Sequence, residues 1–150
     1  MFGWIQTRCG KKRSPVYVFA GLGIRIKMAR IILIEDSNYL RGILKKTLEY
    51  EGHEVLDAQD GKAGERLYRE GCPELVITDI LMPRKDGLEI IFELRRDFPD
   101  IKILAISGGG RIGSEHYLDM AKSLGAHDIL GKPFKQNDLL KSVRKLLKQH

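Results

Sequence analysis

From Ala29 onward, short apolar runs alternate with segments whose apolar residues recur at helical spacing. The apolar runs are nearly continuous, and they predict strands over residues 29–36, 53–58, 75–79, 102–107 and 127–130. Runs of this kind are typical of parallel strands that are covered on both faces of a sheet, rather than of strands with one wet face.

The segments between these runs predict five helices. The first begins after Ser37, a typical N-cap residue, and ends near Gly52. The others are expected from Gly61 to Gly71, over 88–98, up to Gly125, and over 136–148. Strict alternation of strand and helix implies right-handed crossovers and a doubly wound α/β sheet. One domain, over residues 28–150, accounts for the whole pattern.

The formal net charge of +6 belongs to the first 27 residues rather than to this domain. They contain six basic residues and no acidic residue, which leaves 20 basic and 20 acidic residues for the remainder. A neutral body argues against a basic nucleic-acid-binding surface, so we expect no direct nucleic-acid partner.

The N-terminal extension, residues 1–27, places a basic stretch before an apolar one, as a signal peptide would. The apolar part, 16–24, is only about 9 residues long, whereas about 20 are needed to cross a bilayer. We therefore expect no membrane contact, a cytoplasmic location, and an extension that is disordered or an artefact of an upstream start site.

The cysteines and histidines indicate no metal or disulfide chemistry. Cys9 and Cys72 lie far apart without C-x-x-C pairing, and the four histidines are scattered. Neither a zinc site nor a disulfide scaffold is expected, and a reducing compartment fits best.

Polar residues follow several predicted strands at the edge where ligands bind in such sheets. Glu35 and Asp36 follow the first strand, Asp79 ends the third, Ser107 ends the fourth, and Lys132 follows the fifth. A carboxylate at the end of a buried strand such as LVITD is costly, because burial penalises charge. It requires either a neutralising partner or a chemical role.

Three carboxylates on one edge repel each other by roughly 4 kcal/mol per pair at about 4 Å. A cluster of oxygen ligands suits Mg²⁺, which binds a few carboxylates together with water and phosphoryl oxygens. A lysine and a hydroxyl beside them complete the groups needed for phosphoryl transfer to an aspartate. Taken singly, Glu35-Asp36 is also explained as an acidic pair at a helix N-terminus, and Lys132 as a solvated lysine.

The segments IEDS, LVITDILMPRKDG, AISG and GKPF resemble the receiver domain of bacterial two-component response regulators. The resemblance runs from about Arg30 to the C-terminus, and it is to the stand-alone, chemotaxis-regulator-like type. It implies a flavodoxin-like (βα)5 fold with strand order 2-1-3-4-5.

The resemblance also implies a role for each residue at the edge of the sheet. Asp79 would be the phosphoacceptor, with Ser107 and Lys132 contacting the phosphoryl group. Mg²⁺ would be held by three side chains and one backbone carbonyl, namely those of Glu35, Asp36, Asp79 and Leu81. The Lys132–Pro133 peptide bond would be cis.

One position departs from the family pattern. Many receivers carry an aromatic residue three positions before the lysine, and it moves inward on activation; here that position is Ile129. We therefore expect the signal to pass through the glycine-rich loop that begins at Gly108 and through the helix that follows it.

The resulting hypothesis is a phosphorylation-controlled switch in two-component signal transduction. It would accept its phosphoryl group from a sensor histidine kinase or a phosphotransfer protein, act on an unknown output protein, and be a monomer or weak dimer. It would not be an enzyme beyond self-catalysed phosphorylation and dephosphorylation of Asp79.

Two alternatives stay open. The first is a degenerate receiver that binds partners without phosphorylation, which Ile129 leaves possible. The second is a Mg²⁺-dependent aspartyl-phosphate hydrolase of the haloacid dehalogenase type. It is disfavoured because that family needs an acid two residues after the nucleophile, where this chain has Leu81.

Overall fold

The computed structural model describes residues 16–19, 24–108 and 113–148. Its main sheet has five parallel strands in the order β4-β3-β5-β6-β7. The strands are β3 (Arg30–Ile34), β4 (Glu54–Ala58), β5 (Leu75–Asp79), β6 (Lys102–Ser107) and β7 (Asp128–Gly131). Numbered within this sheet, the order is 2-1-3-4-5, which confirms the predicted flavodoxin-like fold.

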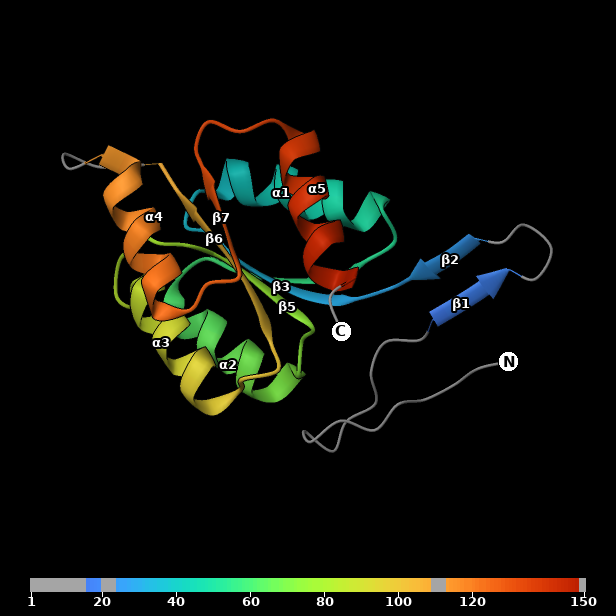
Figure 1. Ribbon diagram of the computed structural model, residues 1–150, viewed down its shortest axis with the longest axis horizontal. Helices are drawn as coiled ribbons and strands as arrows, with labels where there is room; N and C mark the ends of the chain where they lie inside the picture. The colour runs from blue at the N-terminus through green and yellow to red at the C-terminus, as the bar shows by residue number, and fades with distance from the viewer. Residues whose placement is uncertain (1–15, 20–23, 109–112, 149–150) are drawn as a thin grey trace.

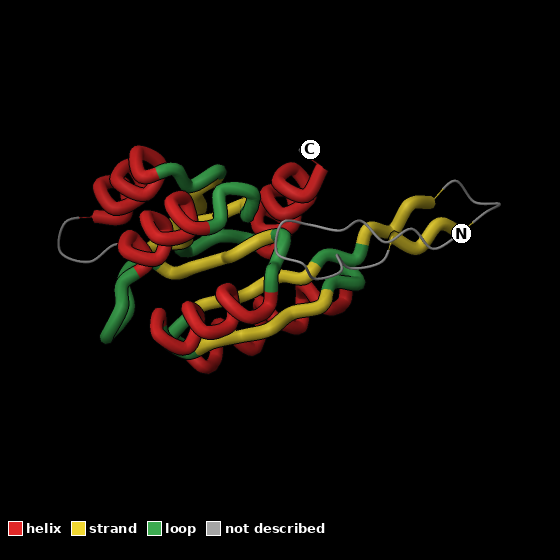
Figure 2. The backbone as a smooth tube through the Cα atoms, turned by 90° about the horizontal axis from the view of Figure 1, so that it is seen from below, coloured by secondary structure: helices red, strands yellow, loops and turns green. Residues whose placement is uncertain are grey.

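Five helices alternate with these strands and cover both faces of the sheet (Figure 1; Figure 2). They are α1 (Asn38–Tyr50), α2 (Gly61–Gly71), α3 (Gly87–Asp97), α4 (Gly113–Leu124) and α5 (Gln136–Lys148). Helices α1 and α5 lie on one face, and α2, α3 and α4 lie on the other (Figure 1). The predicted boundaries agree with these helices to within a few residues.

Short polar side chains begin three of the helices. Ser37, Asp60 and Asp86 are the N-cap residues of α1, α2 and α3, and each accepts a hydrogen bond from a backbone N–H of the first turn. Asp36 therefore lies directly before the N-cap of α1, and one loop separates Asp79 from the N-cap of α3. The caps help to determine where these two helices begin.

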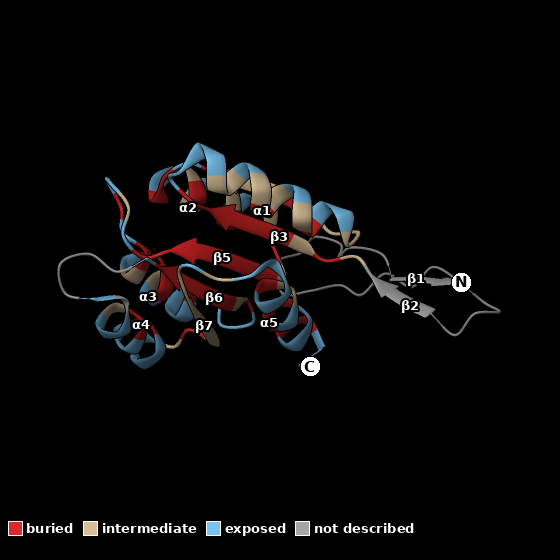
Figure 3. Cartoon of the chain, turned by 90° about the horizontal axis from the view of Figure 1, so that it is seen from above, coloured by how far each residue is buried: buried red, intermediate tan, exposed pale blue. Residues whose placement is uncertain are grey.

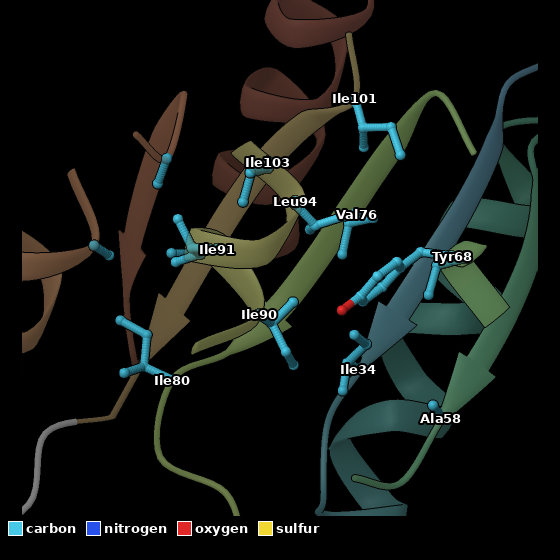
Figure 4. Packing of buried hydrophobic residues seen from close by; sticks show 14 of the residues in the cluster. Ile34, Ala58, Tyr68, Val76, Ile80, Ile90, Ile91, Leu94, Ile101 and Ile103 are labelled. Atoms are coloured by element: carbon cyan, nitrogen blue, oxygen red, sulfur yellow. The ribbon is translucent and has the colours of Figure 1, made fainter. Parts of the chain in front are cut away.

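The sheet is buried between two apolar clusters (Figure 3). One cluster lies under α2, α3 and α4 and includes Tyr68, Ile90 and Leu118, part of which is drawn in Figure 4. The other lies under α1 and α5 and includes Leu44 and Leu139. All five residues of β5 are buried, so Asp79 is presented from the most enclosed strand of the molecule.

A two-stranded antiparallel ribbon, β1 (Val16–Phe19) and β2 (Ile24–Lys27), precedes the domain. It projects from the end of the molecule at which β3 begins (Figure 1). The sequence pattern predicted no element there. The rest of the N-terminal extension lies outside the described residues, and the domain boundary at residue 28 stays a prediction.

Cys72 departs from the expectation drawn from the cysteine pattern. Cys72, in a left-handed conformation at the end of α2, is disulfide-bonded, so the expectation of no disulfide is wrong for this residue. Its position before Pro73 carries no sequence signal for pairing.

None of the described helices has the length and apolar character needed to cross a membrane.

Candidate functional site

Three carboxylates meet at the carboxyl edge of the sheet, and we call Glu35, Asp36 and Asp79 the acidic cluster. Glu35 and Asp36 follow β3, and Asp79 is the last residue of the neighbouring strand β5. One oxygen from each lies within 4.8 Å of the others. Glu35 and Asp79 are buried, whereas Asp36 is exposed. Among the three residues of the cluster, Asp36 is thus the one that faces solvent.

Lys132 supplies the positive charge beside this cluster. Its Nζ lies 2.8 Å from Glu35 Oε2 and 3.4 Å from Asp79 Oδ2. The other oxygen of Glu35 accepts a hydrogen bond from the backbone N–H of Ser37, at 3.1 Å. Glu35 is thus satisfied from two sides, and Lys132 stands between it and Asp79. The Lys132–Pro133 peptide bond is cis, as expected.

The surroundings of Asp79 oppose its ionisation. Burial and the charge of Glu35 raise the pKa of Asp79 from 3.8 to about 6, although Lys132 acts in the opposite direction. Burial lowers the pKa of Lys132, but its hydrogen bond to Glu35 and the charge of Asp79 raise the pKa overall. Lys132 therefore stays protonated and offsets only part of the repulsion.

The donor set of the acidic cluster fits a hard divalent cation. All its ligand atoms are carboxylate oxygens, which suit Mg²⁺ bound with water. Three carboxylates stand beside one lysine, so Lys132 does not balance their charge, and a divalent cation would neutralise the remainder. Within the described residues, this is the one group of acidic, histidine or cysteine side chains spaced to hold a metal ion.

Ser107 and Gly108 lie next to Lys132. Ser107 is buried at the end of β6, and its carbonyl accepts a hydrogen bond from the backbone N–H of Lys132 at 2.8 Å. A Cβ on Gly108 would lie 3.4 Å from the Lys132 side chain. The sequence-predicted residues of β6 and of the loop after β7 are therefore brought together beside the acidic cluster.

The remaining predicted residues lie around this centre. Leu81 is partly exposed in the loop after β5, and Ile129, half-buried in β7, packs against the cluster under α2, α3 and α4. The loop after Gly108, to which the signalling prediction refers, lies outside the described residues at 109–112.

Two cations that support the backbone and the loops of the site were not predicted from the sequence. Arg41 donates from Nη1 to the carbonyl of Glu35 at 2.8 Å and from Nε to Asp57 at 3.0 Å. Lys85, in the loop after Asp79, is buried between two glutamates. In the sequence, both read as ordinary charged residues on a helix or in a loop, because their partners are far along the chain.

A parallel five-stranded sheet with buried acids and a lysine at its carboxyl edge is the arrangement that the family resemblance implies. The chain belongs to the response regulator receiver domain family, whose model matches residues 31–144. This confirms the predicted resemblance and places the chain among the proteins of two-component systems.

Two curated relatives illustrate the similarity. Response regulator MprA of Mycolicibacterium vanbaalenii is 35% identical over 120 residues, which are 80% of this chain and 51% of that protein. This chain thus spans about half the length of the MprA relatives that it matches. The response regulator receiver protein CpdR of Brucella abortus is 33% identical over 120 residues, and the match covers 98% of that protein.

Solved structures agree in fold. A response regulator receiver domain protein from Clostridium thermocellum superimposes with a TM-score of 0.76 and 29% identity, covering 81% of this chain and 96% of that one. The chemotaxis response regulator CheY4 of Vibrio cholerae superimposes with a TM-score of 0.72 and 27% identity, covering 80% of this chain and 99% of that one.

Proposed function

We propose that this chain is a phosphorylation-controlled switch that accepts a phosphoryl group on Asp79 in the presence of Mg²⁺. The observation that carries this proposal is the pairing of a buried Asp79 with Lys132 inside the acidic cluster. A structural role alone does not account for three carboxylates, two of them buried, gathered at one edge. Three acids beside a lysine support a site that would receive a cation and an anion together.

In the proposed reaction, a carboxylate oxygen of Asp79 attacks the phosphorus of a phosphohistidine. The new P–O bond forms as the P–N bond breaks, and the departing imidazole keeps the electron pair of that bond and is protonated by water. Lys132 lies within reach of Asp79 and would pair with the phosphoryl oxygens. Ser107, at the end of the adjacent strand, would donate its hydroxyl to one of them.

Mg²⁺ would be held by Glu35, Asp36 and Asp79, together with the Leu81 carbonyl that the family resemblance implies. When bound, it would neutralise the negative charge that the carboxylates and the phosphoryl group bring together. The chain's own residues provide the rest: burial of Asp79, orientation of Glu35 by Ser37, and a fixed ammonium at Lys132.

The donor would be a sensor histidine kinase or a phosphotransfer protein, because receiver domains interact with histidine kinases. The output would be a change in protein–protein contacts, passed on through Gly108 and α4 rather than through an aromatic residue at position 129. The position of Gly108 supports this route, because a Cβ added there would lie 3.4 Å from the Lys132 side chain.

Intact-mass spectrometry after incubation with acetyl phosphate and Mg²⁺ tests the proposal. We expect the wild-type chain to gain the mass of one phosphoryl group, and Asp79→Ala to gain none. Omission of Mg²⁺ should abolish the gain. A wild-type chain that binds Mg²⁺ but shows neither an adduct nor release of free phosphate would instead be a binding module that works without phosphorylation.

A further inference from the structure

Lys85 is a buried cation in the loop between Asp79 and α3. Only 7% of its side chain is exposed, and its Nζ lies 2.7 Å from Glu65 Oε2 on α2 and 2.6 Å from Glu93 Oε2 on α3. Burying an ammonium is unfavourable unless it is well paired. The two carboxylates provide that pairing, so the loop is fastened to two helices through one side chain.

The backbone of the loop is packed as tightly as its side chain. The N–H of Gly87 donates to the carbonyl of Ile80 at 2.8 Å, which closes the loop upon itself. At Gly61, the first residue of α2, an added Cβ would lie 2.2 Å from the carbonyl oxygen of Lys85. The loop that leaves Asp79 therefore rests directly on the start of α2.

Lys85 shares its carboxylates with residues that do not belong to the loop. Arg69 Nε lies 3.0 Å from Glu65 Oε1, and Arg69 Nη2 lies 3.6 Å from Glu93 Oε2. The hydroxyl of Tyr68, whose ring is buried in the cluster shown in Figure 4, donates to Glu93 at 2.8 Å. Both glutamates thus keep partners when Lys85 is removed, and what is lost is the link between the loop and these two glutamates.

We propose that Lys85 is a positioning residue for the acidic cluster. By fastening the loop after Asp79 to α2 and α3, it holds the backbone beside Asp79 in the place that a divalent cation on the cluster requires. This inference rests on the Mg²⁺ site of the proposed function, but not on phosphoryl transfer itself. The ion pairs of Lys85 are with Glu65 and Glu93, which lie outside the acidic cluster, so it would act through the loop.

The direction of the effect separates positioning from simple electrostatics. Removing a positive charge near a cation site lowers the repulsion of the cation, so Coulomb interaction alone predicts tighter Mg²⁺ binding in Lys85→Met. Loss of positioning predicts weaker binding. Arg69→Met is the matched control, because it removes a cation from the same glutamates and leaves the loop untouched.

The experiment is a calorimetric titration of the full chain with Mg²⁺ at neutral pH, for wild type, Lys85→Met and Arg69→Met. We expect the dissociation constant to rise about tenfold in Lys85→Met, the lower end of the effects seen when groups that orient metal ligands are removed. We expect it to be unchanged or lower in Arg69→Met. If Lys85→Met does not fold, Lys85→Gln serves in its place, because it is also neutral but keeps one donor, and a smaller rise is expected.

Three results would overturn the inference: unchanged or tighter Mg²⁺ binding in the Lys85 variant, equal weakening in both variants, or no Mg²⁺ binding by the wild type. The intact-mass experiment reports separately on the proposed function. A wild type that gains no phosphoryl group, beside a Lys85 variant with weakened Mg²⁺ binding, would refute phosphoryl transfer and leave the role of Lys85 standing.

Discussion

Asp79 is held in an environment that makes its own charge unfavourable. It is 5% exposed, it lies within the acidic cluster, and the cation that pairs with it among the described residues, Lys132, is closer to Glu35 than to Asp79. Such a carboxylate lowers the stability of the free protein and gains most from ligands that bring positive charge or consume the negative charge. Mg²⁺ brings that positive charge, so the unfavourable burial of the Asp79 carboxylate in the free protein favours the binding of the metal that the proposed function requires.

Replacing Asp79 with Asn should therefore stabilise the metal-free chain at neutral pH. Because the folded state raises the pKa of Asp79 from 3.8 to about 6, the folded protein binds more protons than the unfolded chain in that interval. The stability of the wild type then falls as pH rises from about 4 to about 6. We expect Asp79→Asn to be more stable by about 1–3 kcal/mol above pH 7 and equal to wild type below pH 4.

Urea unfolding at a series of pH values, without divalent cations, measures this difference. Adding Mg²⁺ should reduce the difference in stability between Asp79→Asn and the wild type, because the cation stabilises the wild type by mass action. An Asp79→Asn variant that is less stable than wild type at neutral pH would contradict the charge-burial argument.

The start of α3 is tied to Asp79 by a close backbone contact at Gly87. A Cβ there would lie 2.2 Å from the carbonyl oxygen of Asp79 and 2.7 Å from the Cα of Ile80, and neither backbone atom can move aside cheaply. We expect Gly87→Ala to lower the free energy of unfolding by about 3 kcal/mol, the upper end of typical overpacking costs.

Gly42 is the matched control, because it lies within α1 and a Cβ there would meet nothing within 4 Å. Gly42→Ala should raise the free energy of unfolding by up to about 1 kcal/mol through helix propensity. Denaturant unfolding of both variants tests the contrast. Equal effects of the two substitutions would mean that Gly87 does not hold α3 against Asp79.

The two strands at the edges of the sheet are each joined to a neighbour by a histidine. His53 Nδ1 accepts the backbone N–H of Ala29, and His127 Nδ1 accepts that of Ile103, at 3.3 and 3.1 Å. Burial lowers the pKa of His53; the charge of Glu51 raises it and that of Arg144 lowers it, with a lower pKa overall. Burial also lowers the pKa of His127, and the charges of Lys102 and Arg95 lower it further. Both rings are therefore held in the neutral form that accepts a hydrogen bond.

A histidine with a lowered pKa contributes stability that is present above its unfolded value of about 6.5 and is lost as pH falls through the folded value. His127→Asn places an acceptor that does not titrate near the same backbone N–H. We expect this variant to lose less stability than wild type between pH 7 and pH 5 in urea unfolding. His116 lies on the exposed surface of α4, and His116→Asn should lose as much stability as the wild type over this pH range. If His127→Asn also loses as much as the wild type, the role given to His127 is wrong.

Most of the fold follows from patterns that are local in the sequence. The runs at 75–79 and 102–107 are found as β5 and β6 with the predicted bounds, and α5 spans the predicted 136–148. The first strand is shorter than predicted, 30–34 instead of 29–36, because Glu35 and Asp36 turn away toward the acidic cluster. The ribbon β1–β2 was not predicted, since a short apolar stretch without alternation does not distinguish a strand from an unstructured tail.

The sequence predicted which acidic residues meet at the strand ends, but it did not predict the contacts that support them. Strand ends brought Glu35, Asp36 and Asp79 together because the topology demands it. The burial of Lys85 and its pairing with Glu65 and Glu93 depend on how α2 and α3 pack, and no spacing in RKDG signals it. The sequence also did not reveal that Lys132 would lie closer to Glu35 than to Asp79.

We propose that Asp79, and no other carboxylate of the acidic cluster, accepts the phosphoryl group. Borohydride reduction of the chain after treatment with acetyl phosphate and Mg²⁺, followed by peptide mass spectrometry, tests it most directly, because reduction converts an aspartyl phosphate into homoserine. We predict homoserine at position 79 alone, with Asp36 intact and no conversion when Mg²⁺ is omitted. Homoserine at another aspartate, or none at position 79 in a chain that carries the adduct, would contradict the account.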